Sequence, residues 1–272
     1  MWILYLVATV IIVYVGLIAL LAVNQTNLLF PARMAAANRP ALPNAAERLE
    51  LATSDGERLI GVRLSPPDSA SGTEPLLLGF GGNAWNAEAM ALYLSGLFPR
   101  SEVVAFHYRG YPPSSGQPSA QALLADSTAI FDHLQQNRKR PVIAVGFSIG
   151  TGVAAHLARH RPLEGLVLVT PFDSLQALAK AHFPWAPVNL FLRHRMSPVE
   201  DLRGVSTPTA MIVAGRDTIV PARRSEPLRE AIPNLVLDRT IAEAGHNDLY
   251  GNPEFVEAMR EALARMEAAS AP

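Results

Sequence analysis

The chain has 272 residues, of which 49% are hydrophobic and 17% are charged. This composition suits one α/β domain with a full core, or two small domains. The formal net charge of −1 excludes the basic surface typical of nucleic-acid-binding proteins, so no nucleic-acid partner is expected. Because there is no cysteine, disulfides, thiolate nucleophiles and cysteine metal sites are excluded as well.

An uncharged, apolar run comes first, from Trp2 to Val23. As a helix, about 22 residues span roughly 33 Å, which is enough to cross a bilayer core. The alternatives are a cleaved signal peptide or a buried core helix. A signal peptide normally has a basic start and a small-residue cleavage site. Here no Lys or Arg precedes the run and Ala22-Val23-Asn24 is a poor site, so we predict an uncleaved, single-pass membrane anchor over residues 1–24.

Residues 25–47 contain several prolines and are predicted to be a linker. Arg33 and Arg39 follow the apolar run and favour a cytoplasmic position for what comes after it. Long domains, however, are translocated largely regardless of charge. The sequence therefore leaves open on which side of the membrane the domain lies.

Strands and helices alternate over the predicted domain, residues 48–268. A hairpin is expected to join Leu49–Thr53 to Arg58–Leu64, with a loop over Pro66–Glu74. Further strands are expected at Pro75–Gly79, Glu102–Tyr108, Pro141–Phe147, Gly165–Thr170, Thr209–Ala214 and Leu235–Ile241. Helices are expected at Ala87–Leu97, Ala120–Asn137, Ile149–Arg159, Ala222–Ala231 and Pro253–Met266. Nearly continuous apolar strands alternating with helices indicate a mostly parallel sheet with helices on both faces.

The sequence Gly146-Phe147-Ser148-Ile149-Gly150 stands between an expected strand and an expected helix. This Gly-x-Ser-x-Gly pattern in a strand-to-helix turn is typical of a nucleophile elbow. The glycines remove Cβ atoms where the helix and the strand approach closely, and the serine is left exposed at the end of the strand. The N–H of Ile149, at the start of the helix, is then placed to donate to an oxyanion.

A glycine-rich turn, Gly79-Phe80-Gly81-Gly82-Asn83-Ala84, follows the first expected parallel strand. We interpret it as an oxyanion loop in which the N–H of Asn83 is the second donor. A plain glycine turn and a dinucleotide site are the alternatives. The spacing does not fit Gly-x-Gly-x-x-Gly, and the Lys of a phosphate-binding loop is missing.

Asp217 and His246 each follow a later strand. A histidine there can orient one ring nitrogen toward an acid and the other toward the serine. The order Ser148, Asp217, His246 is the one that a nucleophile-elbow hydrolase requires. Asp173 also follows a strand and is the rival acid, although it can instead cap a helix over Ser174–Lys180.

Three other histidines attract attention. His156 and His160 are spaced like zinc ligands on a helix, but Leu157 stands where a metalloprotease has Glu, which argues against zinc. His107, at a strand end, is interpreted as structural or adjacent to substrate rather than catalytic.

Over residues 48–266 the sequence resembles the α/β-hydrolase superfamily, within it the membrane-anchored serine hydrolases with serine-aminopeptidase-like or monoacylglycerol-lipase-like domains. The motifs that carry the resemblance are Phe80–Ala84, Tyr108-Arg109-Gly110-Tyr111 with Ser114–Ser119, Gly146–Gly150, Gly215-Arg216-Asp217 with Val220-Pro221, and Gly245-His246. The family often has His where Gly81 stands and Asp or Asn where His107 stands. The first departure leaves the oxyanion loop more flexible, and neither touches the triad.

The sequence thus predicts an α/β-hydrolase fold behind a membrane helix, with a short insertion over about 171–206 that is either a lid or a helix packed on the core. The expected reaction is hydrolysis of a carboxylic ester or related acyl bond of a small molecule or lipid, through an acyl-enzyme on Ser148. No metal or organic cofactor is implied. A thioesterase, a peptidase, a non-catalytic binding or scaffold module and a membrane-protein assembly factor remain open, as does the oligomeric state.

Overall fold

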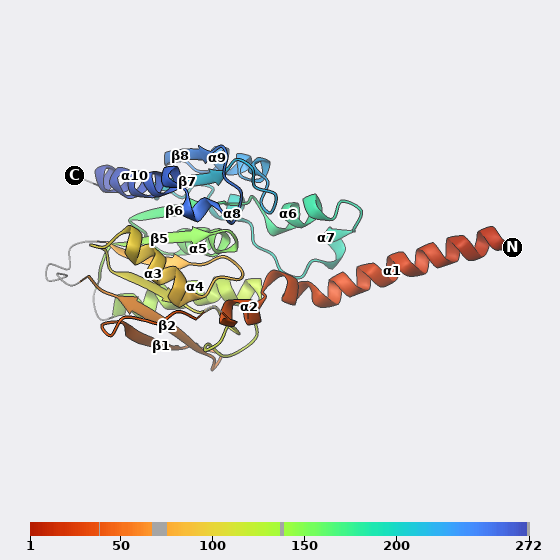
Figure 1. The fold of residues 1–272 in the computed structure, drawn as a ribbon, viewed down its shortest axis with the longest axis horizontal. Coiled ribbons are helices and arrows are strands. Elements are labelled where there is room, and N and C mark those ends of the chain that lie inside the picture. Colours follow the sequence, from red (N-terminus) through yellow and green to blue (C-terminus); the bar gives the residue numbers. More distant parts are fainter. Residues whose placement is uncertain (38, 67–74, 137–138, 271–272) are drawn as a thin grey trace.

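In the computed structural model, residues 1–37, 39–66, 75–136 and 139–270 are described. Most of the expected loop Pro66–Glu74, and Asn137 at the end of the expected helix Ala120–Asn137, lie outside the described residues. The described part of the chain forms an eight-stranded sheet in the order β1-β2-β4-β3-β5-β6-β7-β8 (Figure 1). Its strands are β1 (Glu47–Ala52), β2 (Arg58–Leu64), β3 (Leu76–Phe80), β4 (Val103–Phe106), β5 (Val142–Phe147), β6 (Gly165–Val169), β7 (Thr209–Ala214) and β8 (Leu235–Ile241).

The hairpin β1–β2 joins the sheet in antiparallel fashion, and all pairings from β4 to β8 are parallel. Successive strand residues point to opposite faces of the sheet, and both faces are apolar, so helices cover both of them. Leu76 and Leu78 pack in one core cluster with residues of α4 (Ala120–Gln136) and α5 (Ile149–His160). Leu77 packs in the other with α3 (Ala87–Leu97) and α10 (Pro253–Ser270). The predicted fold is confirmed.

Most predicted elements are shifted by one to a few residues at their ends, and two of the differences have a clear local cause. The strand expected over Glu102–Tyr108 ends at Phe106, because the chain then turns and the hydroxyl of Ser114 donates to the carbonyl of His107 at 2.9 Å. The helix expected over Ala222–Ala231 divides into a 3₁₀ turn, Ala222–Arg224, and α9 (Glu226–Ala231). Pro227 has no N–H and is tolerated only in the first turn of a helix, so α9 starts just before it.

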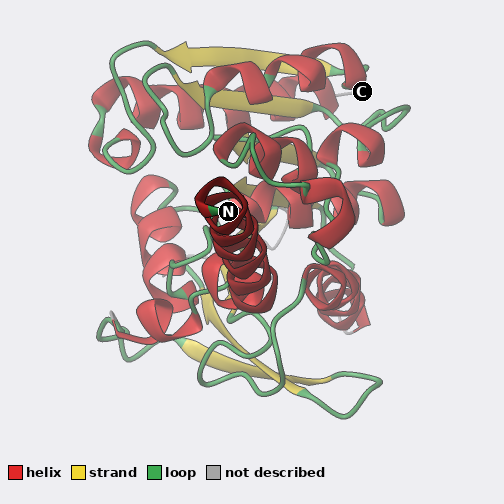
Figure 2. Ribbon diagram, turned by 90° about the vertical axis from the view of Figure 1, so that its right-hand side faces the viewer, coloured by secondary structure: helices red, strands yellow, loops and turns green. Residues whose placement is uncertain are grey.

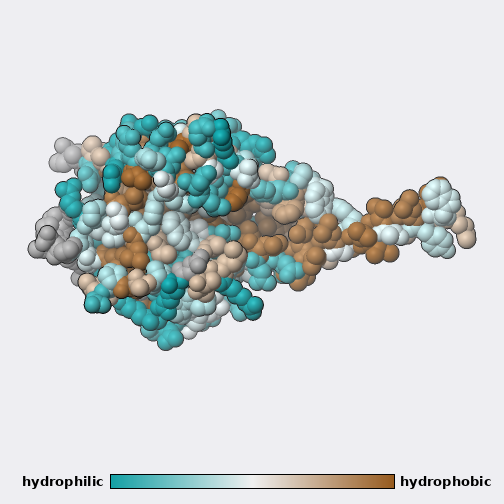
Figure 3. Space-filling view, viewed as in Figure 1, coloured by the Kyte–Doolittle hydropathy of each residue, from teal (hydrophilic) through white to brown (hydrophobic). Residues whose placement is uncertain are grey.

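The N-terminal helix α1 (Trp2–Leu29) stands out from the globular part of the molecule (Figures 1 and 2). With the short helix α2 (Ala32–Ala37) it makes a stretch that is long and apolar enough to cross a membrane, and the most apolar 18-residue window of this stretch has a mean hydropathy of 2.9. Only 6% of its most apolar window is buried, which excludes the alternative of a core helix. Figure 3 shows the apolar surface running along α1 to its junction with the rest of the molecule.

The segment 25–47 differs from the expected linker. Helix α1 continues to Leu29 and α2 follows at once, so much of the segment is helical. Phe30 and Ala35 are each only 2% exposed and belong to the hydrophobic core. Burial of an aromatic ring stabilises the packed state, whereas a free linker would leave the ring exposed to water. The end of α1 is therefore packed against the domain.

The insertion expected over 171–206 has two parts. Helices α6 (Leu175–His182) and α7 (Val188–Phe191) lie beside α1 (Figure 1), and we refer to residues 175–192 as the cap. The remainder, with α8 (Pro198–Asp201), is packed on the core, where Met196 and Leu202 are buried. Packing on the core therefore applies to this remainder, whereas a lid role for the cap stays a prediction.

Candidate active site

Ser148 lies in the turn between β5 and α5, with the left-handed backbone angle φ of 52° and ψ of −118°. A non-glycine residue in this region is strained, and such strain gathers at functional sites. Its two glycine neighbours are required by close approach. A Cβ on Gly146 would lie 2.6 Å from the carbonyl oxygen of Gly150, and one on Gly150 would lie 2.1 Å from that of Phe80. The two glycines of the Gly-x-Ser-x-Gly pattern thus avoid steric clashes between the helix and the strands, as predicted.

The structure brings the three predicted triad residues together. Nε2 of His246 lies 3.1 Å from Oγ of Ser148, and Nδ1 of His246 lies 2.6 Å from Oδ2 of Asp217. Ser148 follows β5, Asp217 follows β7 and His246 follows β8. Because the carboxyl ends of parallel strands meet at one edge of a sheet, residues almost 100 positions apart form one hydrogen-bonded row.

The carboxylate of Asp217 is fixed on both oxygens. Oδ1 accepts from the N–H groups of Ile219 at 2.8 Å and Val220 at 2.7 Å, which leaves Oδ2 for His246. The side chain is only 1% exposed. An acid held in this way sets the ring orientation and the tautomer of its histidine, with Nδ1 protonated and Nε2 free to accept from the serine hydroxyl.

Asp173, the rival acid, has other partners. Its Oδ2 forms an ion pair with Arg224 at 3.0 Å, and its Oδ1 accepts from the N–H of Ser174 at 2.8 Å. The expectation that it caps α6 is wrong in detail. The N-cap is Ser174, whose hydroxyl accepts from the N–H of Ala177 at 3.1 Å.

The glycine-rich turn after β3 lies against the elbow. A Cβ on Gly82 would be 3.8 Å from Cβ of Ser148, so the backbone passes close to the serine. Ile149 is the first residue of α5, and its N–H therefore has no partner within the helix. These positions suit Ile149 and Asn83, the residue after Gly82, as the two amide donors of an oxyanion hole.

Two tyrosines hold this turn from the side, and sequence reasoning gave them no role. The hydroxyl of Tyr108 donates to the carbonyl of Gly81 at 2.8 Å, and that of Tyr111 donates to the carbonyl of Asn83 at 2.7 Å. Burial raises the pKa of both phenols, so both remain protonated donors. The signal was present in the Tyr108–Tyr111 motif, but only the fold shows what the hydroxyl groups contact.

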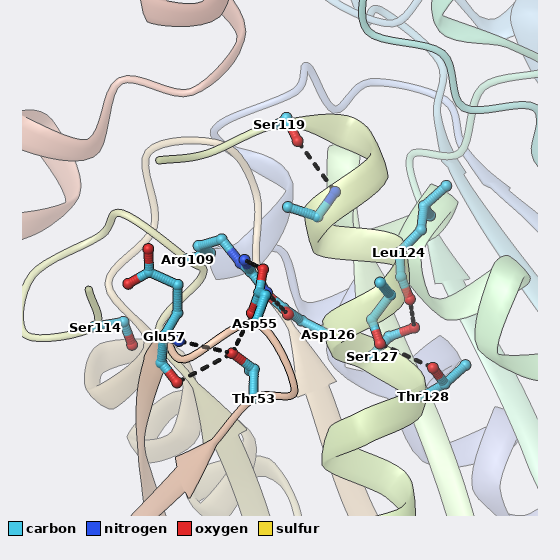
Figure 4. Close-up of polar contacts among 12 residues, drawn as sticks. Thr53, Asp55, Glu57, Arg109, Ser114, Ser119, Leu124, Asp126, Ser127 and Thr128 are labelled. Carbon is cyan, nitrogen blue, oxygen red and sulfur yellow. Dashed lines mark hydrogen bonds and ion pairs between the residues drawn. The ribbon is translucent and has the colours of Figure 1, made fainter. Parts of the chain in front are cut away.

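Arg109, between the tyrosines, anchors the same motif to its surroundings (Figure 4). Its guanidinium donates to both oxygens of Asp126, at 3.0 and 2.6 Å, and also to Asp55 in the β1–β2 turn. The hydrogen bond from Arg109 lowers the pKa of Asp55 to about 2. A bidentate pair of this kind fixes both position and direction, so the loop that bears the tyrosines is held rigidly.

His107 is structural, in agreement with one of its two interpretations. The ring is buried, with Nε2 at 3.7 Å from Oε1 of Glu88, and Glu88 accepts two hydrogen bonds from Arg39, at 2.8 and 2.9 Å. Burial lowers the pKa of His107. His156 and His160 stack on each other, and within the described residues no group of three possible ligands surrounds a metal position.

The sheet order, the elbow and the row of Ser148, His246 and Asp217 define an α/β hydrolase, and the comparisons with known proteins agree. The sequence profile described as the alpha/beta hydrolase family matches residues 76–198. Over 260 residues the chain is 34% identical to an uncharacterized protein of Mycobacterium tuberculosis, which covers 92% of this chain and 89% of that protein. The chain belongs to the alpha/beta hydrolase family.

Among the relatives with a described activity is the lysophosphatidylserine lipase ABHD12 of Rattus norvegicus, 27% identical over 238 residues, or 74% of this chain. The match spans only 58% of that lipase. Of the solved structures, an alpha-beta hydrolase from Vibrio vulnificus superimposes with a TM-score of 0.68 at 21% identity, covering 88% of this chain and 92% of that one. The Pyrococcus furiosus esterase Pf2001 gives 0.64 at 19%, covering 84% and 96%. At these identities the structures show the fold alone.

Proposed function

We propose that the protein is a membrane-anchored serine hydrolase that cleaves a carboxylic ester of a lipid or other small acyl substrate. The observation that supports it most strongly is the continuous hydrogen-bonded row from Oγ of Ser148 through His246 to Asp217. Such a row activates a serine that is otherwise a weak nucleophile. The lipase among the relatives supports an ester bond in a lipid.

In the proposed reaction His246 takes the proton of Ser148 as Oγ attacks the ester carbonyl carbon. The N–H groups of Ile149 and Asn83 stabilise the oxyanion, and Asp217 stabilises the imidazolium. His246 then gives the proton to the leaving alcohol, and an acyl-enzyme forms on Ser148. Water, deprotonated by His246, attacks this ester and releases the carboxylic acid. His246 returns the proton to Oγ, so the enzyme ends as it began.

Replacing the nucleophile tests the proposal. Ser148→Ala should lower kcat for p-nitrophenyl esters by about 10⁶, as loss of a serine nucleophile does elsewhere, and should abolish labelling by a fluorophosphonate. The matched control is Ser119→Ala, which loses only the hydrogen bond to the N–H of Ala122 at the start of α4. Near wild-type turnover by a folded Ser148→Ala protein would reject the proposal, and an unlabelled but folded wild type would favour a binding module instead.

The anchor is tested separately. Because α1 is apolar and exposed, the full-length protein should stay with membranes after carbonate extraction, with its N-terminus intact. Recovery of the protein in the supernatant would contradict anchoring. An N-terminus that begins after Val23 would show instead that α1 is a cleaved signal sequence.

A further inference from the structure

An apolar cavity of about 130 Å³ lies between α1 and the cap, and Ser148 is not among its lining residues. Its walls include Ile18, Leu21 and Ala22 from α1 and Phe183, Val188 and Phe191 from the cap. An apolar cavity of about 150 Å³ in another protein stays dry and binds benzene, so this one has room for a stretch of hydrocarbon chain. None of its lining residues takes part in the proposed reaction.

The cavity lies at the depth of a bilayer if α1 is a membrane span. The contacts between α1 and the cap begin at Tyr14, whose hydroxyl donates to the carbonyl of Trp185 at 3.0 Å, while the apolar run continues to Val23. About ten residues, or roughly 15 Å of helix, therefore both face the cap and belong to the run. At the same level, the opposite face of α1 exposes Leu20 (59%) and Val23 (71%). A bilayer that covers them must also reach the cap.

The cap itself has the surface of a segment that enters a membrane. Phe183, Trp185, Leu190 and Phe191 are exposed, Leu190 to 80%. Large exposed apolar side chains gathered in one place mark an interaction surface. Cations border them: Lys180 precedes the patch, and Arg193 and Arg195 follow it, all exposed. Aromatic residues beside basic ones are typical of the boundary between acyl chains and lipid headgroups.

The cavity is also linked to the triad through the cap. At the end of α6, Nε2 of His182 donates to the carbonyl of Ile219 at 2.7 Å. The N–H of Ile219 in turn donates to Asp217. Helix α6 therefore contacts both sites, because its residue Ala179 lines the cavity and its residue His182 is hydrogen-bonded to the loop of the triad acid.

We infer that the cap lies in the leaflet beside α1, and that the cavity between them binds the acyl chain of a lipid substrate entering sideways from the bilayer. This inference rests on the proposed function, because it takes α1 as a span and Ser148 as the nucleophile. Leu21 is a wall of the acyl site, whereas its neighbour Leu20 faces away from the cap toward lipid. Filling the cavity should therefore act on lipid substrates and not on small esters in water.

The neighbouring leucines give a matched pair of variants. Full-length wild-type, Leu21→Trp and Leu20→Trp proteins are reconstituted in phosphatidylcholine vesicles. We measure the turnover of vesicle-embedded p-nitrophenyl palmitate relative to that of water-soluble p-nitrophenyl acetate. For Leu21→Trp this ratio should fall about tenfold or more, the size of effect that loss of a few buried methylene groups has on specificity. For Leu20→Trp it should stay within about twofold of wild type. An equal ratio in both variants would overturn the inference.

A second measurement does not depend on catalysis. In a Ser148→Ala background, lysophosphatidylcholine with a diazirine near the end of its palmitoyl chain should, on illumination, label peptides of the cap. Leu21→Trp should lower this labelling several-fold and Leu20→Trp should not, because only the first fills the cavity. Unlabelled cap peptides, or equal loss in both variants, would overturn the acyl site. If labelling behaves as expected but wild type cleaves neither ester, the proposed function fails while the acyl site stands.

Discussion

At the triad edge of the sheet, Ser148 is held by a strained backbone, and Asp217 is held by hydrogen bonds to both of its carboxylate oxygens. The face between α1 and the cap lies at the same end of the sheet but is joined mainly by apolar contacts. Its few polar links join Tyr14 to Trp185 of the cap, and Gln25 and Thr26 to the chain at and after the end of the cap. Large side chains there remain exposed, whereas the carboxylate of Asp217 is almost completely buried.

The difference shows what each region is built for. A preorganised site gains its effect from groups that do not move when charge develops, so its residue types are dictated by geometry. A face held by apolar contacts depends on volume and on the surrounding solvent, so many sequences satisfy it. Substitutions at the triad edge should therefore change rate more than stability. Substitutions at the α1–cap face should change stability or the use of lipid substrates, and should leave the turnover of a water-soluble ester near wild type.

The largest effect should distinguish the two candidate acids. Asp217→Asn should lower kcat by about 10⁴ with little change in melting temperature, because the amide leaves His246 in the wrong tautomer. Asp173→Asn should weaken an ion pair with Arg224 and cost about 1 kcal/mol of stability, with near-normal kcat. Steady-state kinetics and thermal unfolding of both variants test this. A large loss of kcat in Asp173→Asn with normal turnover in Asp217→Asn would reverse the assignment.

A smaller effect should come from the support of the oxyanion loop. Tyr111→Phe removes the hydroxyl that donates to the carbonyl of Asn83, so the N–H of Asn83 is less firmly directed at the oxyanion. We expect kcat to fall about tenfold, less than for loss of a direct donor, with KM nearly unchanged.

The control is Tyr93→Phe, which removes a hydroxyl that donates to the carbonyl of Tyr250 at 2.8 Å and not to the oxyanion loop. Its kcat should stay within about twofold of wild type. If Tyr93→Phe and Tyr111→Phe lose the same activity, the hydroxyl of Tyr111 acts through general stability and does not position the loop.

Most of the fold was predictable because its signals are local. Buried parallel strands appear as continuous apolar runs, and the elbow requires glycine at two positions whatever the rest of the chain does. The prediction of Ser148, Asp217 and His246 as neighbours needed one further step, since the carboxyl ends of parallel strands share an edge. Their arrangement in the structure is the one on which the proposed reaction depends.

The parts that sequence reasoning missed depend on contacts between distant segments. The segment 25–47 has the prolines of a linker, but whether Phe30 is buried depends on distant residues such as His194, whose ring packs against it after the end of the cap. The roles of Tyr108 and Tyr111 likewise depend on carbonyl groups almost 30 residues away. Neither propensity nor periodicity contains such information, because both describe a residue by its neighbours in the chain.

The smallest effect concerns Gln25, at the boundary between α1 and the cap. Its amide donates to the carbonyl of Phe191 at 3.1 Å, and its oxygen accepts from the N–H of Arg193 at 2.8 Å. Gln25→Leu keeps the size of the side chain but leaves both backbone groups without these partners. Each buried unpaired group costs about 1–3 kcal/mol, so the end of the cap should open more often.

Hydrogen exchange by mass spectrometry measures this opening where it occurs. The amide of Arg193 should exchange at least about tenfold faster in Gln25→Leu, since 1.4 kcal/mol corresponds to a factor of ten. The matched control is Asn24→Leu, because Asn24 donates only within α1, to the carbonyl of Leu20. Turnover of a water-soluble ester should stay near wild type in both variants, because no triad group contacts Gln25 in the described structure. If Gln25→Leu instead lowers kcat as strongly as Tyr111→Phe, the two regions are coupled, and the α1–cap face belongs to the catalytic machinery.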